Sequence, residues 1–159
     1  MLTHLGEDRP LLTSDWEMIA ASFERGHSAV ELWRLILADA HRERALDIRN
    51  VTIKCATALD VGVQPMVHSF DPGRKMDMTV FKSGLGRMPS LEVADSALYK
   101  SVARLWYSRH GIVHRGQSML YERNPQGGHP PLRPLNGDDV TEFLKAVPRA
   151  IAFVKANAP

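Results

Sequence analysis

The sequence has little cysteine and no long apolar run. Its single cysteine, Cys55, excludes a disulfide within the chain and is typical of proteins from a reducing cytoplasm. The first ten residues contain no apolar run of the kind that a signal peptide needs, and no later stretch has the length and hydrophobicity of a membrane span. We therefore expect a cytoplasmic protein that has no membrane partner.

A strong net charge is also missing. The chain has 20 lysines and arginines against 18 aspartates and glutamates, which leaves a formal net charge of +2. A chain so near neutrality has no general attraction for nucleic acid, so any such affinity must come from a local patch. Its hydrophobic share of 44% and charged share of 24% are ordinary for a soluble globular protein, and no internal repeat is visible. We predict a single domain over residues 1–159.

The spacing of apolar residues predicts an all-α bundle of four to five helices with irregular loops. A capping box, Ser14-x-x-Glu17, begins a first helix that Gly26 should end. Residues 28–64 then carry two apolar stripes of helical period, and Trp33 on the first stripe should pack in the core. The H-R-E-R segment at 41–44 interrupts these stripes, and the sequence leaves open whether the region is one helix or two.

The middle of the chain loses the helical pattern. Pro65 or the turn at residues 71–73 should end the preceding helical region. Residues 76–81 alternate briefly between apolar and polar, which predicts a short strand or an extended loop. Residues 82–87 lack the full glycine-lysine pattern of a phosphate-binding loop, and we interpret them as a glycine connector.

Two further helices are expected in the second half of the chain. The first covers residues 91–109, whose apolar side chains recur every three or four positions. Four prolines and three glycines between residues 124 and 137 then exclude a regular helix. The last helix should be capped by Asp138 or Asp139, and Pro148 should kink it or break it into two pieces.

The segment 106–116, W-Y-S-R-H-G-I-V-H-R-G, carries most of the functional information. Around one glycine it gathers two histidines and two arginines, namely His110, His114, Arg109 and Arg115. No aspartate or glutamate occurs from residue 96 to residue 121, so these cations have no acidic partner nearby in the sequence. Arginine offers forked donors that suit phosphate, and histidine titrates near neutral pH. The segment therefore predicts a site for a phosphate ester.

The spacing within this segment limits how its side chains can meet. Arg109 and His114 are five residues apart, which turns them about 140° away from each other on an unbroken helix. They can act on one atom if the helix ends or bends near Gly111, or if a second copy of the chain supplies the other half. Taken alone, the two cations would also suit a helix C-terminus, where the helix dipole favours positive charge.

A metal site is not expected in this segment. His110 and His114 stand at i, i+4 and could share a metal, but the metalloprotease pattern requires a glutamate where Gly111 stands. The other candidate ligands show no ligand spacing. They are Cys55, His27, His41, His68 and His129.

The segment resembles the Arg-x4-His signature of HEPN domains, with Arg109, a polar residue at 110, and His114. The preceding L-Y-K-S-V-A-R-L-W-Y is similar to the helix that leads into that signature. The resemblance implies a HEPN-like helical bundle and a homodimer in which two motifs face each other and cleave RNA without a metal or other cofactor. In such a site Arg109 and His114 would be catalytic, and His110 would position one of them or touch the substrate.

The resemblance leads to a metal-independent endoribonuclease as the first hypothesis. Arg115 is the best candidate for a contact with the RNA backbone, with Arg104 and Lys100 beside the motif. Trp106 and Tyr107 could stack on bases or face a dimer partner. The alternatives are a non-catalytic HEPN-like module that binds RNA, nucleotide or a protein, and a helical dimerisation domain.

Some HEPN proteins are toxins or defence components. A HEPN toxin can be paired with an antitoxin protein, which can act by modifying a tyrosine two residues after the motif histidine of the toxin. An antitoxin is thus a candidate partner here, but the corresponding position is Gly116, which does not fit that form of control.

Overall fold

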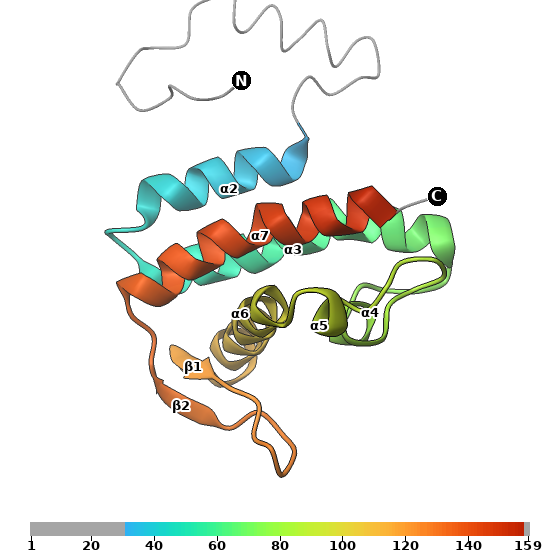
Figure 1. Cartoon of the computed structure of the whole chain (residues 1–159). Coiled ribbons are helices and arrows are strands. Elements are labelled where there is room, and N and C mark those ends of the chain that lie inside the picture. The colour runs from blue at the N-terminus through green and yellow to red at the C-terminus, as the bar shows by residue number, and fades with distance from the viewer. Residues whose placement is uncertain (1–30, 158–159) are drawn as a thin grey trace, which may run out of the picture. The chain divides into compact units, whose positions relative to one another are not determined.

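Six helices and a small two-stranded sheet make up the part of the chain that the structure describes (Figure 1). The computed structural model describes residues 31–157, of which those from Leu32 onward belong to one compact unit. The elements are α2 (Leu32–Glu43), α3 (Ile48–Phe70), α4 (Met78–Ser83), α5 (Leu91–Ala94), α6 (Ser96–Arg115), β1 (Met119–Tyr121), β2 (Pro131–Pro134) and α7 (Gly137–Asn157). The prediction of an all-α fold is confirmed. The helix expected between Ser14 and Gly26 lies outside the described residues.

Two helices cover the described part of the region 28–64. Helix α2 ends at Glu43, and Asp47 begins α3 by accepting a hydrogen bond from the Asn50 amide at 2.9 Å. Lys54 of α3 then reaches back to carboxylates on α2, including Glu43 at 2.7 Å. Helix α3 continues past Pro65 and ends at Phe70, so the turn at residues 71–73 is what stops it.

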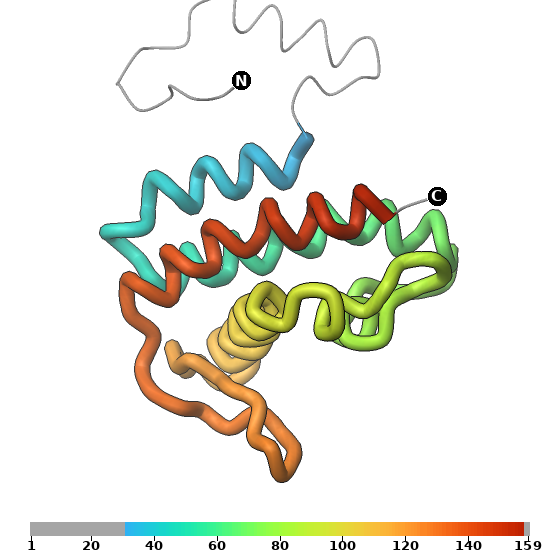
Figure 2. Tube along the Cα trace, in the orientation of Figure 1, coloured from blue at the N-terminus to red at the C-terminus, as the bar shows by residue number. Residues whose placement is uncertain are grey.

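Helix α3 lies at the centre of the core and packs against α2, α6 and α7 (Figure 2). Gly62 permits the close approach, because a Cβ there would lie 2.9 Å from Ile151 Cγ1 of α7 and 3.2 Å from Trp33 Cγ of α2. Trp33 is buried, as its place in the apolar stripe predicts. Burial raises the pKa of Cys55 to about 12, so this residue remains a protonated thiol.

The strand or extended loop predicted at residues 76–81 is wrong, because most of that segment forms α4. Asp77 caps this helix by accepting a hydrogen bond from the Thr79 amide at 2.8 Å. Val80 and Phe81 are fully buried, and this burial outweighs the short alternating pattern. Gly84, with φ of 75°, ends the helix and is followed by a tight turn in which the backbones of Leu85 and Met88 pair.

The single helix expected over residues 91–109 is also wrong in its limits. Asp95 separates α5 from α6 and caps α6 by accepting a hydrogen bond from the Leu98 amide at 2.9 Å. Helix α6 then runs without a break through Gly111 to Arg115, and Gly116 ends it in the left-handed conformation with φ of 68°. In Figure 1, α6 is seen nearly end-on, so it runs across the direction of α3 and α7.

The proline-rich segment after α6 contains a hairpin that the sequence did not predict. Strands β1 and β2 pair antiparallel, with Leu120 opposite Arg133, and β1 packs on α6. A two-stranded sheet has only edge strands, so the prolines of β2 need not donate to a neighbour on their free side.

The expected caps of α7 are likewise corrected. Asn136 accepts hydrogen bonds from the amides of both Asp138 and Asp139, and the helix then continues unbroken through Pro148.

A buried carboxylate joins the hairpin to α7. Asp139 is 3% exposed and accepts two hydrogen bonds from Arg133 of β2, at 2.7 and 2.8 Å, and one from the Asn136 amide at 2.9 Å. Burial alone would raise the pKa of Asp139, but the Arg133 guanidinium and the Asn136 amide outweigh it, and the pKa is lowered. The charged form of Asp139 therefore stabilises the folded state.

Acid should weaken this connection. Because the folded pKa is lowered, the contribution is present above the unfolded value of about 3.9 and is lost as the pH falls through the folded value. Arg133→Ala should cost about 1 kcal/mol at pH 7, since Arg133 is partly exposed, and should reduce the further loss between pH 7 and pH 3. Urea unfolding at both pH values measures this, with exposed Arg87→Ala as control. An equal acid loss in Arg133→Ala and the parent protein would contradict it.

Candidate nucleic-acid interface

The motif residues lie on the C-terminal half of α6, which is straight enough to remain one helix through Gly111. The bend that would have brought Arg109 and His114 together does not occur. Their spacing of five residues on a continuous helix turns the two side chains about 140° apart. Within one chain, therefore, the two principal motif residues point to different sides of α6.

Gly111 has a packing role in this helix. Its Cα lies beneath the ring of Tyr121 from β1, and an added Cβ would be 2.6 Å from the tyrosine Oη and 2.7 Å from Cζ. The ring is held by a hydrogen bond from Tyr121 Oη to Gln117, and the Tyr121 amide donates to Ser108 Oγ. Glycine at this position therefore lets the hairpin rest on α6, and it does so without bending the helix.

The two motif histidines share one exposed side of α6. The ring centroids of His110 and His114 are 4.2 Å apart, with an angle of 44° between the ring planes. Desolvation, together with the positive charge of His114 and the two neighbouring arginines, lowers the pKa of His110. His110 is thus favoured in its neutral form near pH 7, in which one ring nitrogen can accept a proton.

Arg109 lies on another side of the helix and is half-buried. Its guanidinium carbon is 5.7 Å from the centroid of the Trp106 ring. It also faces Asp60 of α3, although the two form no direct ion pair. Burial raises the pKa of Asp60, and the nearby positive charge of Arg109 acts in the opposite direction. Asp60 lies 49 positions earlier in the sequence than Arg109 (109 − 60 = 49), so no local pattern could have indicated this neighbour.

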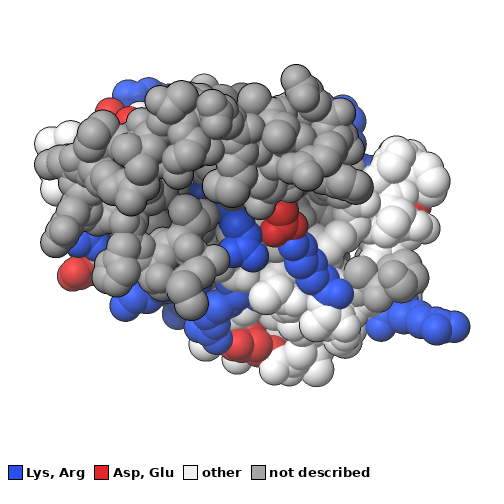
Figure 3. Space-filling view, turned by 90° about the horizontal axis from the view of Figure 1, so that it is seen from above, with Lys and Arg blue, Asp and Glu red and all other residues white. Residues whose placement is uncertain are grey.

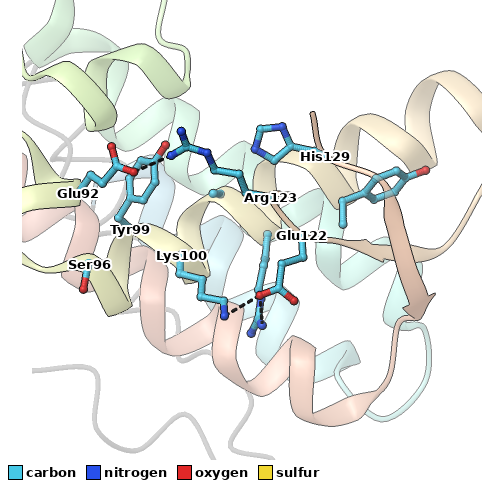
Figure 4. Close-up of a pocket in the computed structure, with 10 residues that line it drawn as sticks. Glu92, Ser96, Tyr99, Lys100, Glu122, Arg123 and His129 are labelled. Carbon is cyan, nitrogen blue, oxygen red and sulfur yellow. Dashed lines mark hydrogen bonds and ion pairs between the residues drawn. The ribbon is translucent and has the colours of Figure 1, made fainter. Parts of the chain in front are cut away.

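Lys100 and Arg104 are engaged in ion pairs. Both contact Glu122, Arg104 at 3.0 Å (Figure 4). Arg104 also lies 3.6 Å from Glu142 of α7. Arg115 differs from them, because its side chain is exposed and makes no hydrogen bond or ion pair with any described residue. The structure thus separates the candidate RNA contacts into one exposed, unpaired cation and two that would have to exchange a carboxylate for phosphate.

The aromatic residues of the motif are partly buried. Tyr107 stacks on His129 from the loop between the strands, with ring centroids 3.5 Å apart and an angle of 19° between the planes. Trp106 packs against the core and under the Arg109 guanidinium. Neither side chain is a freely exposed platform for bases.

The part of the described surface that Figure 3 shows is mixed in charge. On the face seen in Figure 3, the lysines and arginines of the described residues lie among acidic and uncharged side chains. Among residues 31–157, no three histidines, cysteines, aspartates or glutamates are grouped so as to hold a metal ion. No helix in that range is both long enough and apolar enough to cross a membrane.

Comparisons with known protein families, curated proteins and solved structures found no match. The chemistry of the α6 residues is therefore the basis on which a function can be argued. Those residues are two exposed imidazoles in contact, a half-buried arginine on another side of the same helix, and an exposed arginine at the helix end.

Proposed function

We propose that the protein is a metal-independent endoribonuclease of the HEPN kind that acts as a two-fold homodimer. One observation carries the proposal: the side chains of Arg109, His110, His114 and Arg115 form no hydrogen bond or ion pair with any described residue. Asp60 lies near Arg109 but forms no ion pair with it, so no described carboxylate pairs directly with these four cationic or titratable groups, which repel one another when charged. A phosphodiester supplies the missing negative charge.

The chemistry follows from the two residue types. The 2′-hydroxyl of the RNA attacks the adjacent phosphorus while a neutral imidazole removes its proton, and His110 suits this step because its pKa is lowered. The bond from phosphorus to the 5′-oxygen then breaks, and His114 in its protonated form supplies the proton that this leaving oxygen takes. The products are a 2′,3′-cyclic phosphate and a 5′-hydroxyl. Arg109 stabilises the charge on the phosphorane oxygens.

A second copy of the chain completes the site. Arg109 and His114 of one helix point about 140° apart, so an arginine from one protomer is placed opposite the histidines of the other. Val113 supports this arrangement. It lies between the directions of Arg109 and His114 around the helix and is 50% exposed, which provides an apolar contact at the proposed seam.

The function is tested by incubating the purified protein with mixed RNA in the presence of a metal chelator. We expect cleavage at the same rate with and without the chelator, and fragments that carry 2′,3′-cyclic phosphates. A requirement for added metal would contradict the proposal. Binding of RNA without any cleavage would support the alternative of a non-catalytic module. In a toxin or defence setting, the partner that restrains the activity would be an antitoxin protein.

Binding of RNA should weaken steeply with salt. The contact of Arg115 with a backbone phosphate releases counterions, so Arg115→Ala should reduce the slope of log Kd against log salt by about 0.7. Cleavage should persist, because Arg115 takes no part in the proton transfers. The matched control is Arg49→Ala. This arginine is exposed and lies about 16 Å along α3 from Asp60, the α3 residue near Arg109. An unchanged slope in Arg115→Ala would exclude the phosphate contact.

A further inference from the structure

A pocket of about 260 Å³ lies beside the motif, between α6 and the loop that connects β1 to β2 (Figure 4). Three rings line it, those of Tyr99, Tyr121 and His129, and Ala103 of α6 adds a small apolar side chain. The volume is slightly below the roughly 300–1,000 Å³ of pockets that hold drug-sized ligands. A ligand of one or two rings is the size that fits.

The charged side chains of the pocket are already paired with one another. Arg123 lies 2.7 Å from Glu92, and Lys100 and Arg104 both contact Glu122. Because every cation that lines the pocket has a carboxylate partner, none is free to neutralise a phosphate. The lining nevertheless offers both donors and acceptors around aromatic walls. This combination suits a planar, uncharged ligand with donors and acceptors along its edge.

The pocket and the histidine pair lie along one side of α6. Ala103, Tyr107, His110 and His114 follow one another at intervals of four, three and four residues, which keeps them on a single helical stripe. From Ala103 to His110 the helix rises by about 10 Å. The stacked rings of Tyr107 and His129 lie on this stripe, and His129 itself lines the pocket. A single strand bound in the pocket would therefore pass the stacked rings before it reaches the histidines on the same side of the helix.

We propose that this pocket receives one unpaired nucleobase of the RNA strand whose backbone is cut at the histidine pair, an inference that rests on the proposed function. A base has the size, planarity and mixed hydrogen-bonding edge that the lining calls for. The same chemistry is offered by a free nucleoside, and the experiment below separates the two sources. The pocket would give the enzyme its preference for sequence, while Arg115 contacts the backbone irrespective of sequence.

The first arm of the test uses free nucleosides. Adenosine, guanosine, cytidine and uridine are titrated into the full-length protein, and NMR follows the Ala103 methyl group and the His129 ring. We expect one nucleoside to shift both signals, and Ala103→Leu, which fills the pocket, to weaken its binding about tenfold or more. The matched control is Ala97→Leu, at an exposed position of α6 that does not line the pocket. If Ala103→Leu does not fold, Ser96→Tyr at the exposed rim replaces it, with Ala97→Tyr as its control.

The second arm uses a short RNA with one cleavage site, in which each nucleotide near the cut is replaced in turn by an abasic one. In the parent protein, one abasic position should lower cleavage about tenfold, and in Ala103→Leu the same replacement should have no further effect. A response of this kind identifies the RNA strand as the source of the base. Nucleoside binding without any abasic effect on cleavage would overturn the strand as the source.

Two further results would overturn the inference. One is nucleoside binding that Ala103→Leu and Ser96→Tyr leave unchanged. The other is displacement of the nucleoside by inorganic phosphate alone, which would make this an anion site. The proposed nuclease function is contradicted separately, by an absence of RNA cleavage by the parent protein. The nucleoside titration tests ligand binding in the pocket whether or not RNA is cleaved.

Discussion

Replacing His114 by alanine should lower RNA cleavage by about 10²–10⁴-fold and leave the helical content and the dimer unchanged. An imidazole that transfers a proton in the transition state contributes a factor of this size. The side chain of His114 is exposed, lies against the His110 ring and forms no hydrogen bond or ion pair with a described residue, so its loss leaves no buried partner unsatisfied. Initial rates on a defined RNA measure the effect, and circular dichroism and light scattering check the fold and the dimer.

Substitution of Arg109 should lower RNA cleavage nearly as much as substitution of His114, for a different reason. Arg109→Ala removes the charge that stabilises the phosphorane, which raises the barrier by about 3–4 kcal/mol. Arg109→Lys should recover little activity, because an ammonium group does not reproduce the forked donors of a guanidinium.

The control for these substitutions is His68→Ala, an exposed histidine near the end of α3. It should cleave RNA at the parental rate. A His114→Ala protein that is as fast as the parent would rule out the proposed mechanism.

Mixing the two inactive variants should restore activity. If each site takes Arg109 from one protomer and His114 from the other, a heterodimer of Arg109→Ala and His114→Ala contains one site with both residues intact. Random exchange of subunits makes half of the dimers heterodimers, so the mixture should recover about a quarter of the parental rate. Recovery should appear at the rate of subunit exchange, which light scattering or a labelled protomer can follow.

The same experiment distinguishes a shared site from a site within one chain. When both residues act from the same protomer, every site in the heterodimer lacks one of them and the mixture stays inactive. A mixture of His110→Ala with His114→Ala provides the internal comparison, because these two side chains lie on the same side of one helix and should not complement each other. A stable monomer at micromolar concentration would contradict the dimeric site directly.

Local pattern was sufficient for the helices that have a continuous apolar stripe and for the grouping of cationic and titratable residues on α6. The core position of Trp33 and the all-α class both follow from residues spaced three or four apart, because burial of one helical face dominates the stability of such elements. The grouping of Arg109, His110, His114 and Arg115 is likewise visible in the sequence, since they lie within two turns of one helix.

What the sequence left open or missed depended on contacts between distant segments. The alternating residues of α4 form a helix because Val80 and Phe81 are buried in the core. Helix α6 runs past Arg109, and Tyr121 of β1 covers Gly111 there. The sequence of the proline-rich segment did not indicate the hairpin. A short edge strand needs only a surface to pack on, so its residues show little alternation between apolar and polar side chains.

The same distinction applies to the candidate site. The absence of aspartate and glutamate from residue 96 to residue 121 indicated that the cations have no acidic partner nearby in the sequence. Only the tertiary structure shows that Arg104 pairs with Glu122 and Glu142 and that Asp60 lies near Arg109. The pocket lined by Tyr99, Ala103 and His129 also exists only after the strand loop folds back on α6. Helical spacing decides which side chains share a face, whereas ion pairs and pockets join segments that the chain separates by many residues, and packing alone brings those together.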